Sequence, residues 1–173
     1  MGQTFVRSEA SDWTGLALDG QYLRLTDGRA ASSFGPQNAV FDWPLQVQPG
    51  AALAWAPSAS ANAAWVAQAS QCLQALGFAA QQVADVPGLV VARTVVMLIN
   101  EASDAVHQGV CTAQGADDAM QLGVNYPAGP FQWLGHWGAP AVVHVLDQLD
   151  QHYRGERYRV SPGLRHRVWQ ATA

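Results

Sequence analysis

Histidine side chains are the first candidates for acid–base chemistry, because an unperturbed imidazole titrates near neutral pH. The chain has five of them. His107 lies near the C-terminal end of a predicted helix, where a protonated imidazole complements the helix dipole. His144 and His152 face away from the apolar stripe of another predicted helix, which favours solvent exposure over catalysis. His136 lies in a glycine-rich corner and His166 in an arginine-rich segment. No histidine pair has the spacing to a carboxylate that a metal site needs, so we expect no metal.

Two polar pairs could also carry chemistry. Asp117 and Asp118 could form a paired-carboxylate site, but solvated helix surface is the favoured interpretation. Asn100 and Glu101 interrupt an apolar helix, so they need partners. Hydrogen bonds to a loop are favoured over catalysis for this second pair.

The other residue types that often take part in catalysis or binding indicate no site in this sequence. The seven tryptophans are scattered through both halves, which favours core and interface anchoring over ligand stacking. Cys72 and Cys111 lie far apart without metal-ligand spacing and are interpreted as reduced thiols. All nine basic residues are arginine, which removes Schiff-base chemistry and the P-loop lysine. The sequence contains no GxSxG, HExxH or GxGxxG motif.

Composition describes a globular chain. Its 173 residues are 49% hydrophobic and 13% charged, which excludes intrinsic disorder. The net charge is −4, and acids interrupt the arginines near the C-terminus, so we expect no nucleic-acid partner. No apolar run is long enough to span a bilayer, and the first residues contain no hydrophobic signal core. We therefore expect a cytoplasmic protein without a membrane partner.

The first half predicts a small α/β unit with strands around one helix. Turn signals separate the expected strands, which are residues 4–7, 16–18, 22–25, 39–41, 51–56 and 78–83. Ser58 or Ser60 is expected to cap a helix that runs to Leu76, with Gly77 as the glycine after its C-terminus.

The composition changes near Pro87, and the second half is helical. Apolar residues at helical spacing from Leu89 to Val106 predict a long helix that ends at Gly109. Thr112 is expected to cap a short helix closing at Gly123. Further helices are expected at residues 130–136, from Pro140 to about residue 153, and at 162–169. The two halves together predict an α+β chain.

Three motifs in the second half occur in a familiar order: DVPGLVVARTVVMLINEA, GADDAMQLGVNYPAGPF and HVLDQLDQHYRGERYRVSPGLR. With them, residues 85–169 resemble the C-terminal domain of the 3-hydroxyacyl-CoA dehydrogenases. The matching positions are fold-bearing ones, which transfer a fold better than an activity. The structural and interface candidates are Pro87, Gly88, Leu98, Asn100, Glu101, Gly123, Pro127, Gly129, Pro130 and Leu146. Gly123 is expected to permit a left-handed helix exit, and the segment from Pro127 to Pro130 to make a rigid corner.

The departures from the family bear on activity. In the family, a Rossmann domain carries a glycine loop and a catalytic His–Glu pair, and an Asn after the Pro-Gly motif helps to hold the substrate oxygen. That Asn position is Ala92 here, and residues 1–86 are too few for a full Rossmann domain and lack the glycine loop. The resemblance therefore implies no catalytic and no cofactor-binding residue in this chain.

Some bacterial members of the family are duplicated, among them those similar to phenylacetate-pathway 3-hydroxybutyryl- or 3-hydroxyadipyl-CoA dehydrogenases. The second half of such a member pairs a reduced Rossmann-like fragment with a second helical domain. This chain resembles that half, which implies a reduced Rossmann-like fragment at residues 1–86 and an all-α helical domain at 87–173.

The resemblance implies an accessory part of an NAD-dependent 3-hydroxyacyl-CoA dehydrogenase of fatty-acid or phenylacetate-type degradation. NAD would serve the complete enzyme, and this chain alone would bind no cofactor. Its helical domain would pack against itself or against a catalytic dehydrogenase domain and help to form the acyl-CoA cleft. We expect Leu98→Asp or Leu146→Asp to destroy folding or association. Two alternatives stay open: an active enzyme with His136 as base, and a free-standing homodimer that binds acyl-CoA near Trp133 and Trp137.

Overall fold

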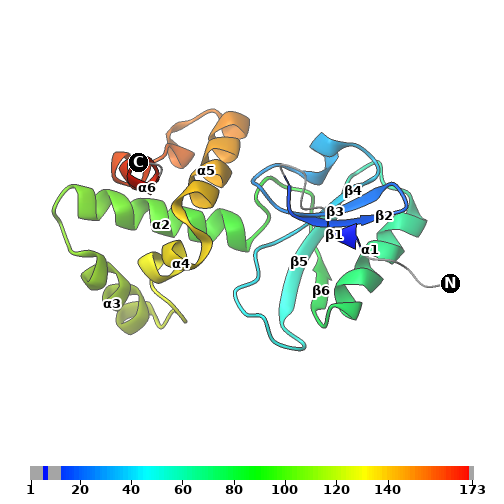
Figure 1. The fold of residues 1–173 in the computed structure, drawn as a ribbon, viewed down its shortest axis with the longest axis horizontal. Coiled ribbons are helices and arrows are strands. Elements are labelled where there is room, and N and C mark those ends of the chain that lie inside the picture. Colours follow the sequence, from blue (N-terminus) through cyan, green and yellow to red (C-terminus); the bar gives the residue numbers. More distant parts are fainter. Residues whose placement is uncertain (1–5, 8–12, 172–173) are drawn as a thin grey trace. The chain divides into compact units, whose positions relative to one another are not determined.

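The computed structural model describes residues 6–7 and 13–171, and the chain divides into two compact units, Met1–Ala92 and Arg93–Ala173 (Figure 1). The first unit holds a mixed sheet and the second holds helices. This α+β organisation, with a Rossmann-like unit followed by a helical unit, is the fold class that the sequence predicts.

The first unit is built on one six-stranded sheet with the strands in chain order. The strands are β1 (Val6–Arg7), β2 (Gly15–Leu18), β3 (Gln21–Leu25), β4 (Asn38–Phe41), β5 (Ala52–Pro57) and β6 (Ala79–Gln82). The pairs β3–β4 and β5–β6 are parallel, and the other neighbours are antiparallel. Parallel neighbours need a crossover; the 3₁₀ helix η1 (Ala31–Phe34) connects the first pair and α1 (Ala63–Ala75) the second.

Helix α1 packs its apolar face against the sheet. Trp65 and Leu73 of α1 are completely buried in one cluster with Leu23 and Leu53 of the sheet. The cap of α1 differs from the prediction, because Asn62 Oδ1 accepts the Trp65 amide at 2.8 Å. The predicted caps bond elsewhere: the Ser58 and Ser60 hydroxyls lie 3.2 Å from each other. Gly77 has φ +91° after the helix, as predicted.

The second unit is a bundle of helices that begins with α2 (Val91–His107). It continues with α3 (Ala113–Val124), α4 (Pro130–Trp137), α5 (Ala139–Tyr153), the 3₁₀ helix η2 (Glu156–Tyr158) and α6 (Pro162–Ala171). Completely buried side chains from α2, α5 and α6 form its interior, among them Ile99, Leu146 and Leu164.

Two helix boundaries differ from the prediction. Leu89 was expected on the long helix, but it is buried before the helix with φ +47°, and α2 begins at Val91. Gly123 does not make a left-handed exit, since α3 continues to Val124 and Asn125 takes that conformation with φ +57°. Asparagine tolerates this region because its side chain bonds locally. The predicted roles of Gly109, Thr112 and Pro130 are confirmed.

No helix among residues 13–171 combines the length and the apolar character needed to cross a membrane.

Candidate functional site

The start of α2 is organised by one buried carboxylate that sequence reasoning missed. Asp42 Oδ2 accepts the amides of Val90 at 2.9 Å and Val91 at 2.6 Å. Its Oδ1 accepts those of Ala92 and Trp43, both at 2.8 Å. The Asp42 side chain is completely buried, and this burial raises its pKa above the usual aspartate value, although the four amides act in the opposite direction. Asp42 follows β4 and is distant in sequence from the helix that it caps.

Ala92 is the position where the resemblance expects an asparagine that holds substrate. It is completely buried, and its backbone amide donates to Asp42. A buried methyl group has no hydrogen-bonding atom. This position therefore offers no polar side-chain atom to a ligand.

The other helix starts of the first unit are also capped by side-chain oxygens. Asp85 Oδ1 accepts the Ala31 amide at 2.7 Å and its Oδ2 accepts the Ser32 amide at 2.9 Å, both at the start of η1. Asn62 caps α1. A dinucleotide pyrophosphate binds in Rossmann folds through free amides at a helix N-terminus. In the described part of this unit, side-chain oxygens of three residues accept amides at the helix starts, and two of these residues, Asp42 and Asp85, are carboxylates.

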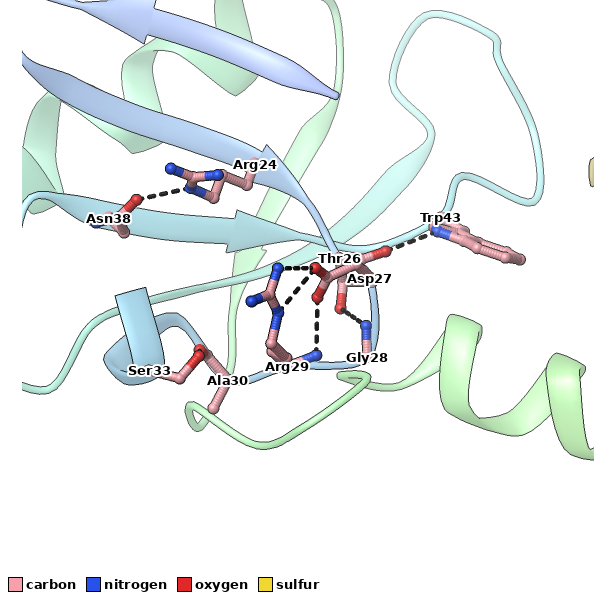
Figure 2. Close-up of polar contacts among 9 residues, drawn as sticks. All are labelled: Arg24, Thr26, Asp27, Gly28, Arg29, Ala30, Ser33, Asn38 and Trp43. Carbon is pink, nitrogen blue, oxygen red and sulfur yellow. Dashed lines mark hydrogen bonds and ion pairs between the residues drawn. The ribbon is translucent and has the colours of Figure 1, made fainter. Parts of the chain in front are cut away.

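The polar groups of the turn after β3 are also bonded to groups of the chain itself. Figure 2 shows Asp27 accepting the Arg29 amide at 3.0 Å and pairing with its guanidinium, at 2.9 Å to Nε and 2.5 Å to Nη2. Thr26 receives the Gly28 amide on its hydroxyl at 3.3 Å, and Trp43 Nε1 donates to the Thr26 carbonyl at 3.0 Å. This turn lies at the carboxyl ends of the parallel β3–β4 pair, where open α/β sheets bind ligands.

Two arginines next to this turn lie against one aromatic ring. The guanidinium carbons of Arg24 and Arg29 lie 4.7 and 4.3 Å from the ring centroid of Phe34, which is cation–π geometry. Arg24 Nε also donates to Asn38 Oδ1 at 2.7 Å (Figure 2). Both cations are thus engaged by the chain's own groups.

In the second unit the two aspartates of the predicted pair separate. Asp118 is exposed, as expected of solvated helix surface, and accepts Gln114 Nε2 at 2.8 Å. That interpretation is wrong for Asp117, which is buried and accepts the Phe131 amide at 2.7 Å at the start of α4. The two side chains do not form a carboxylate pair.

In the second polar pair, Asn100 bonds to a loop as predicted, whereas Glu101 forms no such bond among the described residues. Asn100 is buried; its Nδ2 donates to the Arg159 carbonyl at 3.0 Å and its Oδ1 accepts the Ser161 amide at 2.8 Å. These bonds hold the segment between η2 and α6 against α2. Glu101 is exposed.

The predicted corner before α4 is confirmed as a tightly packed structure. A Cβ on Gly129 would lie 2.3 Å from Asp117 Cγ, so only glycine fits. The Gly129 amide donates to Gln132 Oε1 at 3.1 Å, and Pro130 is the first residue of α4. Pro127 is exposed in the turn.

The remaining candidates are dispersed. Trp133 is buried and its ring stacks on that of Trp137 with the centroids 6.4 Å apart, whereas His136 is exposed. His107, His144 and His152 are exposed. Leu146 is completely buried and Leu98 half-buried, and Pro87 and Gly88 are buried before α2. Among the described residues, no three His, Cys, Asp or Glu side chains group as metal ligands do.

Both parts of the chain match known protein families. Residues 88–171 match the family described as 3-hydroxyacyl-CoA dehydrogenase, C-terminal domain. Residues 23–87 match the family described as 3-hydroxybutyryl-CoA dehydrogenase reduced Rossmann-fold domain.

Curated relatives match mainly one half of the chain. The chain is 47% identical over 96 residues to 3-hydroxyadipyl-CoA dehydrogenase of Escherichia coli K12, which is 56% of this chain and 20% of that protein. It is 33% identical over 90 residues to a probable 3-hydroxybutyryl-CoA dehydrogenase of Bacillus subtilis, which is 52% of this chain and 31% of that protein. The chain thus spans about a fifth to a third of these relatives.

A solved structure covers almost the whole chain. The crystal structure of 3-hydroxybutyryl-CoA dehydrogenase from Escherichia coli K12 superposes with a TM-score of 0.86 at 34% identity. The match covers 96% of this chain and 35% of that one. Both units are therefore similar to parts of one larger dehydrogenase chain.

Proposed function

The chain belongs to the 3-hydroxyacyl-CoA dehydrogenase family, and from this membership we propose that it is an accessory part of an NAD-dependent 3-hydroxyacyl-CoA dehydrogenase. The complete enzyme would oxidise 3-hydroxyacyl-CoA to 3-oxoacyl-CoA. A catalytic partner domain would supply the NAD site and the acid–base residues. The 3-hydroxyadipyl-CoA dehydrogenase among the relatives favours a setting in phenylacetate-type or fatty-acid degradation.

The occupied helix starts of the first unit carry this proposal. NAD needs free amides for its pyrophosphate, whereas Asp85 accepts two amides of η1, Asp42 accepts three at the start of α2, and Asn62 accepts one amide of α1. Asp42 and Asp85 would also repel a pyrophosphate when ionised. These bonds disfavour an NAD pyrophosphate at the starts of η1 and α2, and the proposal assigns no hydride-transfer step to this chain.

Association would be the contribution of the helical unit. Leu122 and Val124, near the end of α3, are 86% and 55% exposed, and the neighbouring Tyr126 is exposed as well. Three large apolar side chains exposed within five residues of sequence favour an interaction surface in this region. We propose that this unit packs against a catalytic dehydrogenase domain or a second copy and helps to form the acyl-CoA cleft.

The test is NADH oxidation by the purified chain at high concentration with acetoacetyl-CoA, followed at the nicotinamide absorbance. We expect no rate above the enzyme-free blank and no saturable change in NADH fluorescence. A rate above the blank would overturn the accessory role. If His136→Ala abolished that rate, the active-enzyme alternative would replace it.

One observation favours a second candidate, an acyl-CoA-binding homodimer. The Trp133 ring stacks on that of Trp137 and also lies next to Tyr126, whose ring centroid is 6.0 Å from that of Trp133. The fluorescence of tryptophans in such a stack changes when a ligand binds next to them. Saturable quenching of tryptophan fluorescence by acetoacetyl-CoA, lost in Trp137→Leu and kept in Trp169→Leu, would support this candidate. Sedimentation velocity would show the dimer.

A further inference from the structure

A cavity of about 250 Å³, open to solvent, lies between the C-terminal half of α2 and α6 within the second unit, and its His107, His166 and Arg167 side chains are exposed. Its walls are formed by Ser103, Val106 and His107 from α2 and by His166, Arg167 and Gln170 from α6. Pockets that hold whole cofactors or drug-sized ligands are larger, about 300–1,000 Å³. This cavity therefore suits a small group.

A glycine brings the two helices close enough to form the cavity. A Cβ on Gly163 of α6 would lie 2.9 Å from both His107 Cβ and the Ser103 carbonyl oxygen. Without that atom, α6 packs directly on α2. The imidazoles of His107 and His166 then meet edge to face, with their centroids 5.8 Å apart and their planes at 87°.

The charged groups on the walls are cationic or can become so. The Arg167 guanidinium lies over the Phe131 ring, 5.0 Å from its centroid, and no described carboxylate forms an ion pair with it. Asp104, one turn before His107, is the acid nearest to it along α2. Its two oxygens already accept from the Ser161 hydroxyl at 3.2 Å and Gln108 Nε2 at 2.6 Å.

No acidic residue lies on α6. Helix α5 packs against α6, and its Asp147 pairs with Arg165 rather than with Arg167. The elements around the cavity thus leave the guanidinium and the two imidazoles without an anionic partner.

Ser103 gives an independent indication of a missing acceptor. This residue is 2% exposed, and its hydroxyl has no hydrogen-bond partner among the described residues. Buried hydroxyls in native proteins are almost always bonded to protein or to ordered water. The hydroxyl oxygen is enclosed by the chain, so an acceptor bound in the cavity would reach it after a local shift of the side chains that cover it.

We propose that the cavity between α2 and α6 binds a phosphate group, held by the Arg167 guanidinium, by the imidazoles of His107 and His166, and by the Ser103 hydroxyl. Arginine and imidazolium form charge-assisted hydrogen bonds with phosphate oxygens, and a tetrahedral anion offers acceptors in several directions. Inorganic phosphate and a phosphate monoester share this chemistry. The site does not depend on the dehydrogenase role of the family.

The experiment is an NMR titration of the full chain, with the five histidine Cε1–H resonances as probes. Inorganic phosphate is added at about pH 6, where histidine carries charge, against chloride at matched ionic strength. We expect the His107 and His166 resonances to shift saturably with phosphate alone, and the affinity to fall at about pH 8. Equal, non-saturable shifts of all five histidines would overturn the proposal. Glycerol phosphate in a parallel titration identifies the favoured source by its relative affinity.

Matched variants separate the site from general surface charge. Arg167→Gln is expected to weaken phosphate binding about tenfold, the loss of one charge-assisted contact. Ser103→Ala should weaken it less, about threefold. Arg157→Gln and His152→Gln, at exposed positions on η2 and α5, should leave the affinity unchanged. Equal affinities for Arg167→Gln and Arg157→Gln, with unchanged thermal unfolding, would contradict the assignment.

Discussion

At the scale of single residues, this chain satisfies its buried carboxylates with backbone amides. Asp42 and Asp117 are both buried; Asp42 accepts three amides at the start of α2, and Asp117 accepts one at the start of α4. A helix start offers partial positive charge and unpaired N–H groups, so it stabilises a carboxylate without a cation. The chain has nine arginines and no lysine, and this use of amides explains how carboxylates remain buried within both units.

Asp42 leads to a prediction with a defined pH dependence. Burial raises the pKa of Asp42 in the folded chain above 3.8, so the folded state binds the proton more tightly than the unfolded state. The stability linked to this proton is fully present below about pH 3.8 and is lost as pH rises through the raised pKa. The free energy of unfolding of the unmodified chain, relative to Asp42→Asn, should therefore fall from about pH 4 to about pH 7. Urea unfolding at both pH values measures the difference.

Asp118→Asn is the control for removing an exposed carboxylate from the same chain. A difference for Asp42→Asn that grows with pH would show that the four amides outweigh burial. Asp42→Ala should cost about 2 kcal/mol or more at any pH, because it leaves buried amides without an acceptor.

At the scale of elements, two glycines of the α4 region differ in what surrounds them. A Cβ at Gly129 would clash with Asp117, whereas nothing lies within 4 Å of a Cβ at Gly135 inside α4. Gly129→Ala should therefore destabilise the chain by about 2 kcal/mol through overpacking. Gly135→Ala should stabilise it by up to about 1 kcal/mol through helix propensity. Chemical denaturation of the two variants checks the opposite signs, and a loss of stability in Gly135→Ala would contradict the packing described for α4.

The helices were largely predictable from sequence, but their long-range caps were not. The apolar spacing from Leu89 to Val106 and the signals at Thr112, Pro130 and Gly109 are local, so each can be read in a short window. The capping oxygen of α2 comes from Asp42, 48–50 residues before the amides that it accepts. No local pattern records such a contact. For the same reason, the buried role of Asp117 and the mixture of parallel and antiparallel strand pairs stayed outside the prediction.

Replacing a leucine by aspartate should have different effects at two positions of the second unit, because the two side chains differ in burial. Leu146 is completely buried, so Leu146→Asp places an unpaired charge in the interior and should abolish cooperative unfolding of this unit. Leu98 is half-buried, so Leu98→Asp should keep the helical circular dichroism spectrum and weaken association instead. Circular dichroism and sedimentation velocity separate the two effects. Val47→Asp is the control, at a side chain that is 81% exposed in the first unit. An unfolded Leu98→Asp would contradict this assignment.

At the scale of the whole molecule, the first unit depends on a few residues that follow Pro87 in sequence. The motifs place the boundary before Pro87, but the residues that follow it in sequence complete the first unit. Leu89 is completely buried in a cluster with Ala31, Val40 and Ala56. The amides of residues 90–92 donate hydrogen bonds to the buried Asp42 carboxylate.

Two fragments test this dependence. A fragment of residues 1–92 keeps the buried Leu89 and the amide partners of Asp42, and it corresponds to the first compact unit. A fragment of residues 1–86 loses both, which removes about 2 kcal/mol of apolar burial and leaves a buried carboxylate with one amide, that of Trp43. We expect the longer fragment to unfold cooperatively on heating and the shorter one to unfold at a much lower temperature or to be unfolded already. Equal unfolding temperatures would mean that the segment 87–92 belongs energetically to the helical unit, and that Asp42 can be buried without it.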